Sequence, residues 1–262
     1  GQVLMSALVT AGLMYKLGPK MDSAIVNILM IVCSIATGII WAVIPALFKA
    51  KWKTNETLFT LMMNYIATGI TAYMISIWAT NGSATMGTIK YAWLPEFVDR
   101  SFLTIVIVAV LTVLMFVYLK FSKHGYELSV VGESENTARY VGINVKKVVI
   151  RTLVLSGAIC GIMGLLLAGS INHTISKTLV DSRGFTAVLV TWLADFNPFY
   201  MVFTAFLISF LKSGSSNVVT DFALNNSAIA SIITGIVIFC VIGCEFFIRY
   251  SVKFANKKKE GK

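Results

Sequence analysis

The side chains that could carry chemistry are few, and they form no catalytic or metal-binding pattern. The four cysteines lie in apolar runs without metal or disulfide spacing, so they are interpreted as small buried hydrophobes: Cys33, Cys160, Cys240 and Cys244. No Gly-x-x-x-x-Gly-Lys-Ser/Thr loop, zinc spacing, nucleophile elbow or pair of catalytic carboxylates is present. We therefore expect no metal, no cofactor and no enzymatic activity, and any ATP that is used must be hydrolysed by a separate chain.

Four polar or aromatic residues remain as candidates for ligand contact. Asn64 and Tyr65 stand together inside an apolar stretch, and polar groups inside membranes face the bundle or a wet cavity. Their role is either interhelical hydrogen bonding or contact with a neutral polyol or nucleobase, through the amide and the ring. Trp192 and Asn197 border a turn between two short apolar stretches, where they either pack or line a path.

The isolated acidic residues and histidines favour structural roles. Glu56 follows the lysines of residues 49–53 and is predicted to pair with them at a helix start. Glu245 stands four residues before an arginine, and no second carboxylate or histidine near it supports a proton relay. His124 and His173 are both expected in loops.

Composition places these residues in a membrane protein. Of 262 residues, 57% are hydrophobic and 13% are charged, whereas soluble domains carry about 25% charged residues. The apolar runs are near the length that crosses a hydrocarbon layer of about 30 Å. A soluble enzyme, a disordered chain and a disulfide scaffold are excluded. The net charge of +10 does not indicate nucleic acid, because the basic residues lie between apolar segments and at the C-terminus.

The predicted fold is an all-α integral membrane protein, a polytopic helix bundle. Unpaired backbone groups are not tolerated in lipid, and sustained period-two alternation typical of a barrel is absent. Eight apolar segments are expected: Gly1–Tyr15, Ser23–Phe48, Thr57–Ala79, Ser101–Leu119, Thr152–Ser170, Gly184–Ala194, Phe199–Leu211 and Ala228–Arg249.

The segment 184–211 is ambiguous. Residues 195–198 split it into two halves, each short for a crossing at about 1.5 Å per residue. Either a helix starts earlier, near Ser176, or a pair of broken helices meets inside the protein.

Basic residues predict the orientation. Alternate loops and the C-terminal tail hold 15 of the 22 Lys and Arg residues, and the richer side is expected to be cytoplasmic. Residues 1–252 then form the transmembrane domain with a cytoplasmic loop at 120–151, and residues 253–262 form a basic cytoplasmic tail. The localisation is a cell membrane, crossed several times.

Two local patterns predict how the helices are held. Gly157, Gly161 and Gly164 lie on one helix face, which indicates close helix–helix packing. In the loop 120–151, Ser134 can cap a short helix over residues 135–141, and Gly142 can end it. So short a helix is not stable alone, so it must dock on its own bundle or on a partner.

Several motifs carry a family resemblance. Gly125-Tyr126-Glu127-Leu128, Val131-Gly132-Glu133 and the run from Ala138 to Val145 resemble the cytoplasmic coupling loop of ABC importer permeases of the ribose/branched-chain amino acid type. Residues 55–67, Gly184-Phe185-Thr186-Ala187 and Asn197-Pro198 resemble its nucleoside/simple-sugar branch. Gly1-Gln2 is similar to the end of the motif Asn-Ile-Gly-x-Glu-Gly-Gln, and we interpret the chain as N-terminally incomplete.

The resemblance implies a permease subunit that works with a cytoplasmic ATPase subunit, a second permease subunit and an extracytoplasmic substrate-binding lipoprotein. It implies ATPase-coupling candidates in the cytoplasmic loop: Tyr126, Glu127, Glu133, Ala138, Arg139, Tyr140 and Gly142. Together with the polar residues above, it implies substrate-path candidates: Gln2, Asn64, Tyr65, Trp192 and Asn197. One departure is that Ala194, Asp195 and Phe196 replace the branch's usual Leu and Gly-Arg before Asn197-Pro198.

Three alternatives stay open. A branched-chain amino acid permease would share the coupling loop. An ion-coupled secondary transporter should carry carboxylates or histidines within its spans, and this chain has almost none centrally placed. A scaffolding membrane protein would leave the ordered cytoplasmic loop unexplained.

Overall fold

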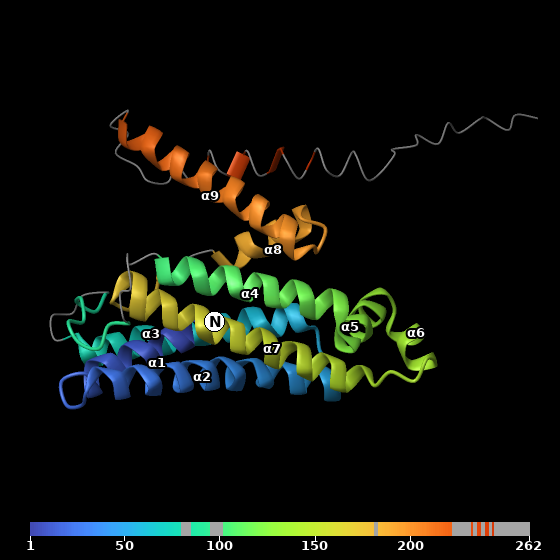
Figure 1. Ribbon diagram of the computed structural model, residues 1–262, viewed down its shortest axis with the longest axis horizontal. Coiled ribbons are helices and arrows are strands. Elements are labelled where there is room, and N and C mark those ends of the chain that lie inside the picture. The colour runs from blue at the N-terminus through green and yellow to red at the C-terminus, as the bar shows by residue number, and fades with distance from the viewer. Residues whose placement is uncertain are drawn as a thin grey trace, which may run out of the picture. The chain divides into compact units, whose positions relative to one another are not determined.

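The computed structural model describes residues 1–79, 85–94, 102–180 and 183–221, with six further residues between 232 and 243. Over these residues the chain is helical apart from connecting segments and an isolated β-bridge between Thr85 and Ser176. The all-helical class is therefore confirmed. The chain divides into two compact units, Gly1–Asp181 (unit 1) and Ser182–Lys262 (unit 2), and each is described by itself (Figure 1).

Five described helices are long and apolar enough to cross a membrane, which makes the chain a multi-pass membrane protein. They are α2 (Ser23–Trp52), α3 (Glu56–Trp78), α4 (Phe102–Phe121), α7 (Val145–Leu166, continued by the π-helix η1, Leu167–Asn172) and α9 (Pro198–Asp221). The apolar helices α1 (Gln2–Leu17) and α8 (Arg183–Leu193) are shorter. The coarser prediction of a polytopic helical bundle holds, whereas eight membrane segments are not established.

Several helices extend beyond the predicted apolar segments, as α2 does by ending at Trp52 and not at Phe48. Helix α7 starts at Val145 rather than Thr152, because Asn144 caps it and its Oδ1 accepts the Lys147 N–H at 3.2 Å. The helix α9 continues ten residues past the expected end at Leu211. The alternative of a helix start near Ser176 is wrong, since residues 176–180 are not helical. Most of the predicted span 228–249, with Cys244 and Glu245, lies outside the described residues, as does the tail 253–262.

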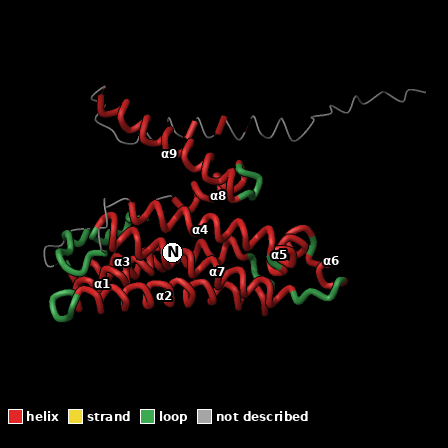
Figure 2. The backbone as a smooth tube through the Cα atoms, in the orientation of Figure 1, coloured by secondary structure: helices red, strands yellow, loops and turns green. Residues whose placement is uncertain are grey.

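Unit 1 is built around a seam in which α7 packs against α2 and α1, side by side in Figures 1 and 2. A Cβ atom at Gly38 would lie 2.2 Å from the carbonyl oxygen of Gly157, and one at Gly161 would lie 2.8 Å from the Cα atom of Ile35. At Gly164 it would lie 2.7 Å from the Val3 carbonyl oxygen. The predicted close packing through glycines of α7 is confirmed, and we call this contact the glycine seam.

The two ends of unit 1 differ. At one end lie the short helices α5 (Lys123–Glu133) and α6 (Glu135–Tyr140) (Figure 1). At the other end the extended segment 85–94 is bonded to residues 169–176, with the Met86 N–H donating to the Ile175 carbonyl at 3.1 Å and the Ile89 N–H to the His173 carbonyl at 2.8 Å. Helix α2 ends beside the start of α7 at the α5–α6 end, so Lys49 and Arg151 share that end.

Candidate functional site

The short helix α6 forms as the caps predict. The Ser134 Oγ accepts the Thr137 N–H at 3.3 Å, and the Arg139 Nη2 lies 3.3 Å from the Glu135 Oε2 one turn earlier. The helix ends at Tyr140, one residue earlier than expected. Gly142 then adopts a φ of +85°, which favours glycine and turns the chain toward α7.

One face of α6 is anchored and the other is open. Ala138 is fully buried, and its carbonyl accepts the Ile143 N–H at 2.9 Å. Tyr140 is 97% exposed, and the Arg139 side chain is half exposed. An aromatic side chain left in solvent on a six-residue helix is typical of a surface that a partner covers.

The preceding helix α5 was not predicted as a helix. The Ser122 Oγ caps it by accepting the Gly125 N–H at 3.0 Å. A Cβ atom at Gly125 would lie 2.1 Å from the Leu119 carbonyl oxygen, so the turn from α4 into α5 needs glycine there. His124 belongs to the first turn of α5, which corrects its placement in a loop. Tyr126 and Glu133 are exposed on this helix.

A charged pair joins α5 to α7. The Arg151 Nη2 donates to the Glu127 Oε2 at 3.0 Å, and the His124 Nδ1 lies 3.8 Å from the same oxygen. The hydrogen bond from Arg151 holds the pKa of the Glu127 carboxyl below its usual value, and the charges of Arg151, His124 and Lys123 act in the same direction. Glu127 is therefore a carboxylate directed at its own bundle.

A hollow of about 520 Å³ lies between α5, α7 and the turn from α2 to α3. Its apolar lining comes from facing side chains of α5 and α7, among them Leu128, Val131 and Val149. At its edge Lys49 donates to the Glu56 carboxylate, which confirms the predicted pairing. The helix α5 thus leaves part of the α7 surface beside it uncovered.

The neighbouring residues Asn64 and Tyr65 lie on different faces of α3. The Asn64 Oδ1 accepts a hydrogen bond from the Gly1 nitrogen at 2.8 Å, next to the half-buried Gln2. Tyr65 is 76% exposed on another face. That face continues along α3 at helical spacing and is uncovered by the described residues: Met62, Tyr65, Ile66, Gly69, Ala72, Tyr73, Ser76 and Ile77. We call these residues the open face of α3.

In unit 2 the turn between α8 and α9 is tightly shaped. Asp195 and Phe196 have φ values of 50° and 58°, and the Asn197 Oδ1 accepts the Phe199 N–H at 3.0 Å. Asn197 therefore caps α9, whatever else it contacts. Trp192 is 67% exposed within unit 2.

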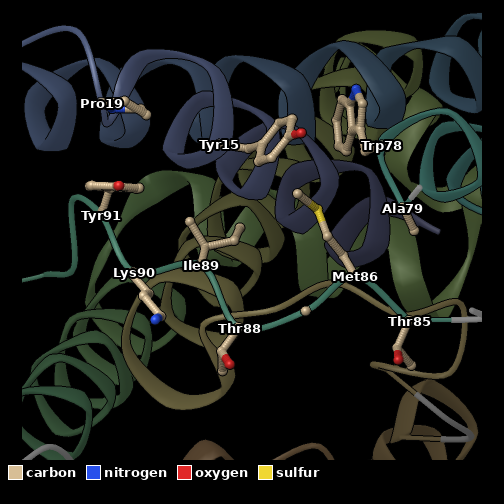
Figure 3. Close-up of a pocket in the computed structure, with 11 residues that line it drawn as sticks. Tyr15, Pro19, Trp78, Ala79, Thr85, Met86, Thr88, Ile89, Lys90 and Tyr91 are labelled. Atoms are coloured by element: carbon tan, nitrogen blue, oxygen red, sulfur yellow. The ribbon is translucent and has the colours of Figure 1, made fainter. Parts of the chain in front are cut away.

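A second hollow, of about 540 Å³, lies at the end of unit 1 remote from α5 and α6. Figure 3 shows the residues that line it. Tyr15, Trp78 and Tyr91 line it together with the extended segment 85–91. The Tyr15 and Trp78 ring centroids lie 6.2 Å apart. Aromatic residues at the end of a helical bundle are typical of the membrane–water interface.

The comparison with protein families decides the identity. Residues 1–242 match the model of the permease component of branched-chain amino acid transport systems. The chain belongs to this family. Because its members are transport permeases and not enzymes, the chain is a membrane transport subunit, in agreement with the resemblance found in the sequence.

Curated relatives include a guanosine ABC transporter permease, NupP of Bacillus subtilis, which is 27% identical over 88% of this chain and 68% of its own length. NupB of Lactococcus lactis, a nucleoside permease, is 25% identical over 74% of this chain and 57% of its own length. TsgB13 of Haloferax volcanii, a glucose permease, is 24% identical over 99% and 72%. No solved structure matches the chain.

Within this permease the candidate residues form two groups. All seven coupling candidates lie on or directly after α5 and α6, at one end of unit 1. Of the path candidates, Gln2, Asn64 and Tyr65 lie in unit 1, while Trp192 and Asn197 lie in unit 2.

Sequence reasoning missed three positions in unit 1. Arg151 was considered only as one of the basic residues that predict the orientation, although its side chain binds Glu127, 24 residues away. Gly69 and Tyr73 were also missed; the signal for them was the helical spacing that continues from Tyr65 along the open face of α3.

Proposed function

We propose that the chain is the path-forming permease subunit of an ABC importer for nucleosides or simple sugars. The named relatives support this substrate class, although the chain spans between 57% and 72% of their lengths. The proposed partners are a cytoplasmic ATPase subunit, a second permease subunit and an extracytoplasmic substrate-binding lipoprotein. ATP-driven closure of the ATPase would displace α6 and tilt the bundle in an alternating-access cycle.

The observation that carries the proposal is the exposure of α6. Its Ala138 is buried and its Tyr140 is almost wholly exposed, so the helix presents a defined surface on an anchored base. The buried Ala138 already docks this six-residue helix on unit 1, which leaves the exposed Arg139 and Tyr140 for a partner. Docking on a separate ATPase fits this surface, because the chain itself has no nucleotide-binding loop.

The contrast between α3 and α4 supports the substrate path. The uncovered side of α4 from Phe102 to Val117 is apolar, and the mean hydropathy of the helix reaches 2.9, as expected for contact with lipid. The corresponding value for α3 is 1.4, and its open face carries the hydroxyl groups of Tyr65, Tyr73 and Ser76. Polar groups at this depth favour a wet cavity, so we assign the open face of α3 to the path.

The stacking role of the tyrosines is testable. Tyr65→Leu and Tyr73→Leu should each raise the KM for uptake at least about fivefold, since ring stacking on a base contributes about 1 kcal/mol or more. The permease–ATPase complex should stay assembled. Phe102→Leu on the lipid-facing α4 is the control. An unchanged KM in both tyrosine variants would remove the open face of α3 from the path.

From the distribution of basic residues we propose that residues 120–151 and the C-terminus lie in the cytoplasm. The helices α8 and α9 then form either two spans or a re-entrant pair. Single cysteines at Asn136 and Thr88, both exposed and at opposite ends of unit 1, test the first part in a cysteine-free background. A third single cysteine, at Asn256, tests the C-terminus. In sealed cells an impermeant thiol reagent should modify the Thr88→Cys variant and spare the Asn136→Cys and Asn256→Cys variants. Labelling at 136 would reverse the topology.

The substrate class is tested by uptake. The full-length protein, co-expressed with its ATPase and second permease in cells that lack such importers, should import radiolabelled guanosine or glucose in an ATP-dependent manner. Leucine uptake alone would instead support the branched-chain amino acid alternative. Uptake that follows an ion gradient and persists without ATP would support a secondary transporter.

A further inference from the structure

The helices α5 and α6 share one capping residue, Ser134, which ends the first helix and begins the second. The Ser134 N–H donates to the Val130 carbonyl at 3.1 Å, which closes α5. Its Oγ accepts the Thr137 N–H, which opens α6. Ser134 is therefore the single residue between the two helices, and its backbone and side chain are both hydrogen-bonded.

The contact from α5 to the rest of unit 1 is much less continuous. A hollow of about 520 Å³ is lined by side chains of both α5 and α7. Across this side the Glu127 carboxylate and the Arg151 guanidinium meet at 3.0 Å, with exposed side-chain fractions of 20% and 33%. Where apolar packing is incomplete, a charge-assisted hydrogen bond is the strong directional contact.

Arg151 stands on α7 less than two turns before Gly157, the first glycine of the glycine seam. From there onward α7 cannot slide on α2 or α1, because backbone atoms already touch at Gly157, Gly161 and Gly164. A force on Arg151 therefore moves α7 together with its two neighbours.

We propose that the Glu127–Arg151 pair is the mechanical link that transmits displacement of α6 into the bundle. The inference rests on the proposed function, because it requires an ATPase that acts on α6. In it Glu127 and Arg151 are positioning residues: Glu127 acts through Arg151 on the bundle, while Arg139 and Tyr140 meet the ATPase. Neither Glu127 nor Arg151 touches substrate or nucleotide.

The test separates coupling from assembly. Glu127→Gln and Arg151→Gln variants of the full-length permease are purified with the ATPase and the second permease and reconstituted in liposomes. The complex should form and hydrolyse ATP, while substrate imported per ATP hydrolysed falls about threefold or more, within the range by which coupling residues act. The charge-swapped double variant, Glu127→Arg with Arg151→Glu, should recover most of the loss.

Lys147→Gln is the matched control, since it removes one positive charge from an exposed position one turn earlier on α7. It should leave the import ratio unchanged. The link is refuted if both single variants import normally per ATP, if the charge swap fails to recover import, or if the single variants lose the ATPase. The last result would make Glu127 or Arg151 a direct docking residue. Failure of the proposed function looks different, because the unmodified protein would then show no ATP-dependent import.

Discussion

Two regions of unit 1 are held together by different kinds of contact. In the glycine seam, α1, α2 and α7 touch through backbone atoms, and Ser34 donates a buried hydrogen bond to the Gly161 carbonyl at 2.5 Å. In the α5–α6 segment, side-chain caps and ion pairs hold short helices over a hollow. Close-packed interiors resist deformation and transmit strain. The seam is therefore the closely packed part of unit 1, whereas the α5–α6 segment depends on a few polar contacts.

The largest expected effect is in the seam. Gly161→Leu should cost at least about 2 kcal/mol, because a Cβ atom there already meets backbone atoms of Ser34 and Ile35, which cannot move aside. Gly69→Leu is the control, since the space beside Gly69 is open. The measurement is thermal unfolding and monodispersity after detergent extraction. Equal stability of the two variants would contradict the distinction between the regions.

The next effect is in the segment, and there it should spare the fold. Replacing Arg139 and Tyr140 by Ala should weaken ATPase binding about 30-fold or more, if the pair contributes at least one contact of about 2 kcal/mol. The unfolding temperature should stay at the wild-type value, because both side chains face solvent. Asn136→Ala, on the same helix, is the control. Binding titrations on the detergent-solubilised permease measure the effect, and wild-type affinity with normal uptake would exclude α6 as the coupling helix.

The two regions also differ in how far sequence predicts them. The seam was predictable, because glycines three and four residues apart share a helix face, and α6 was predictable from Ser134 and Gly142. The helix α5 was not, because its polar composition and two interior glycines resemble a loop. The partner of Glu127 could not be identified either, since the bond to Arg151 depends on how α5 folds back on α7. Apolar segments likewise predicted the membrane part of α7 but not its start at Val145, which a polar cap fixes outside the apolar run.

A smaller effect on stability is expected from the hydrogen bond that joins α2 to α7 in the glycine seam. Ser34→Ala should lower the free energy of unfolding by about 1 kcal/mol, because it leaves the buried Gly161 carbonyl without its donor from α2. Thr37→Ala is the matched control on the same helix, since the Thr37 Oγ1 donates only to the Cys33 carbonyl one turn earlier. Denaturant titration in mild detergent compares them. If both variants lose the same stability, the bond between α2 and α7 has no special role.

The smallest effect should come from the cap that joins α5 to α6. Ser134→Ala removes the oxygen that accepts the Thr137 N–H, which costs about 1 kcal/mol of helix stability. Because α6 is six residues long, this loss frays the helix before it docks, and ATPase affinity should fall about fivefold. Ser134→Asp keeps a capping oxygen and should restore the affinity, whereas Ser129→Ala, an exposed position on α5, should have no effect. The seam should be indifferent to all three variants, so their unfolding temperatures should coincide. A shift in unfolding temperature with unchanged ATPase affinity would contradict this assignment. The α5–α6 segment would then contribute to the stability of unit 1 and not to ATPase binding.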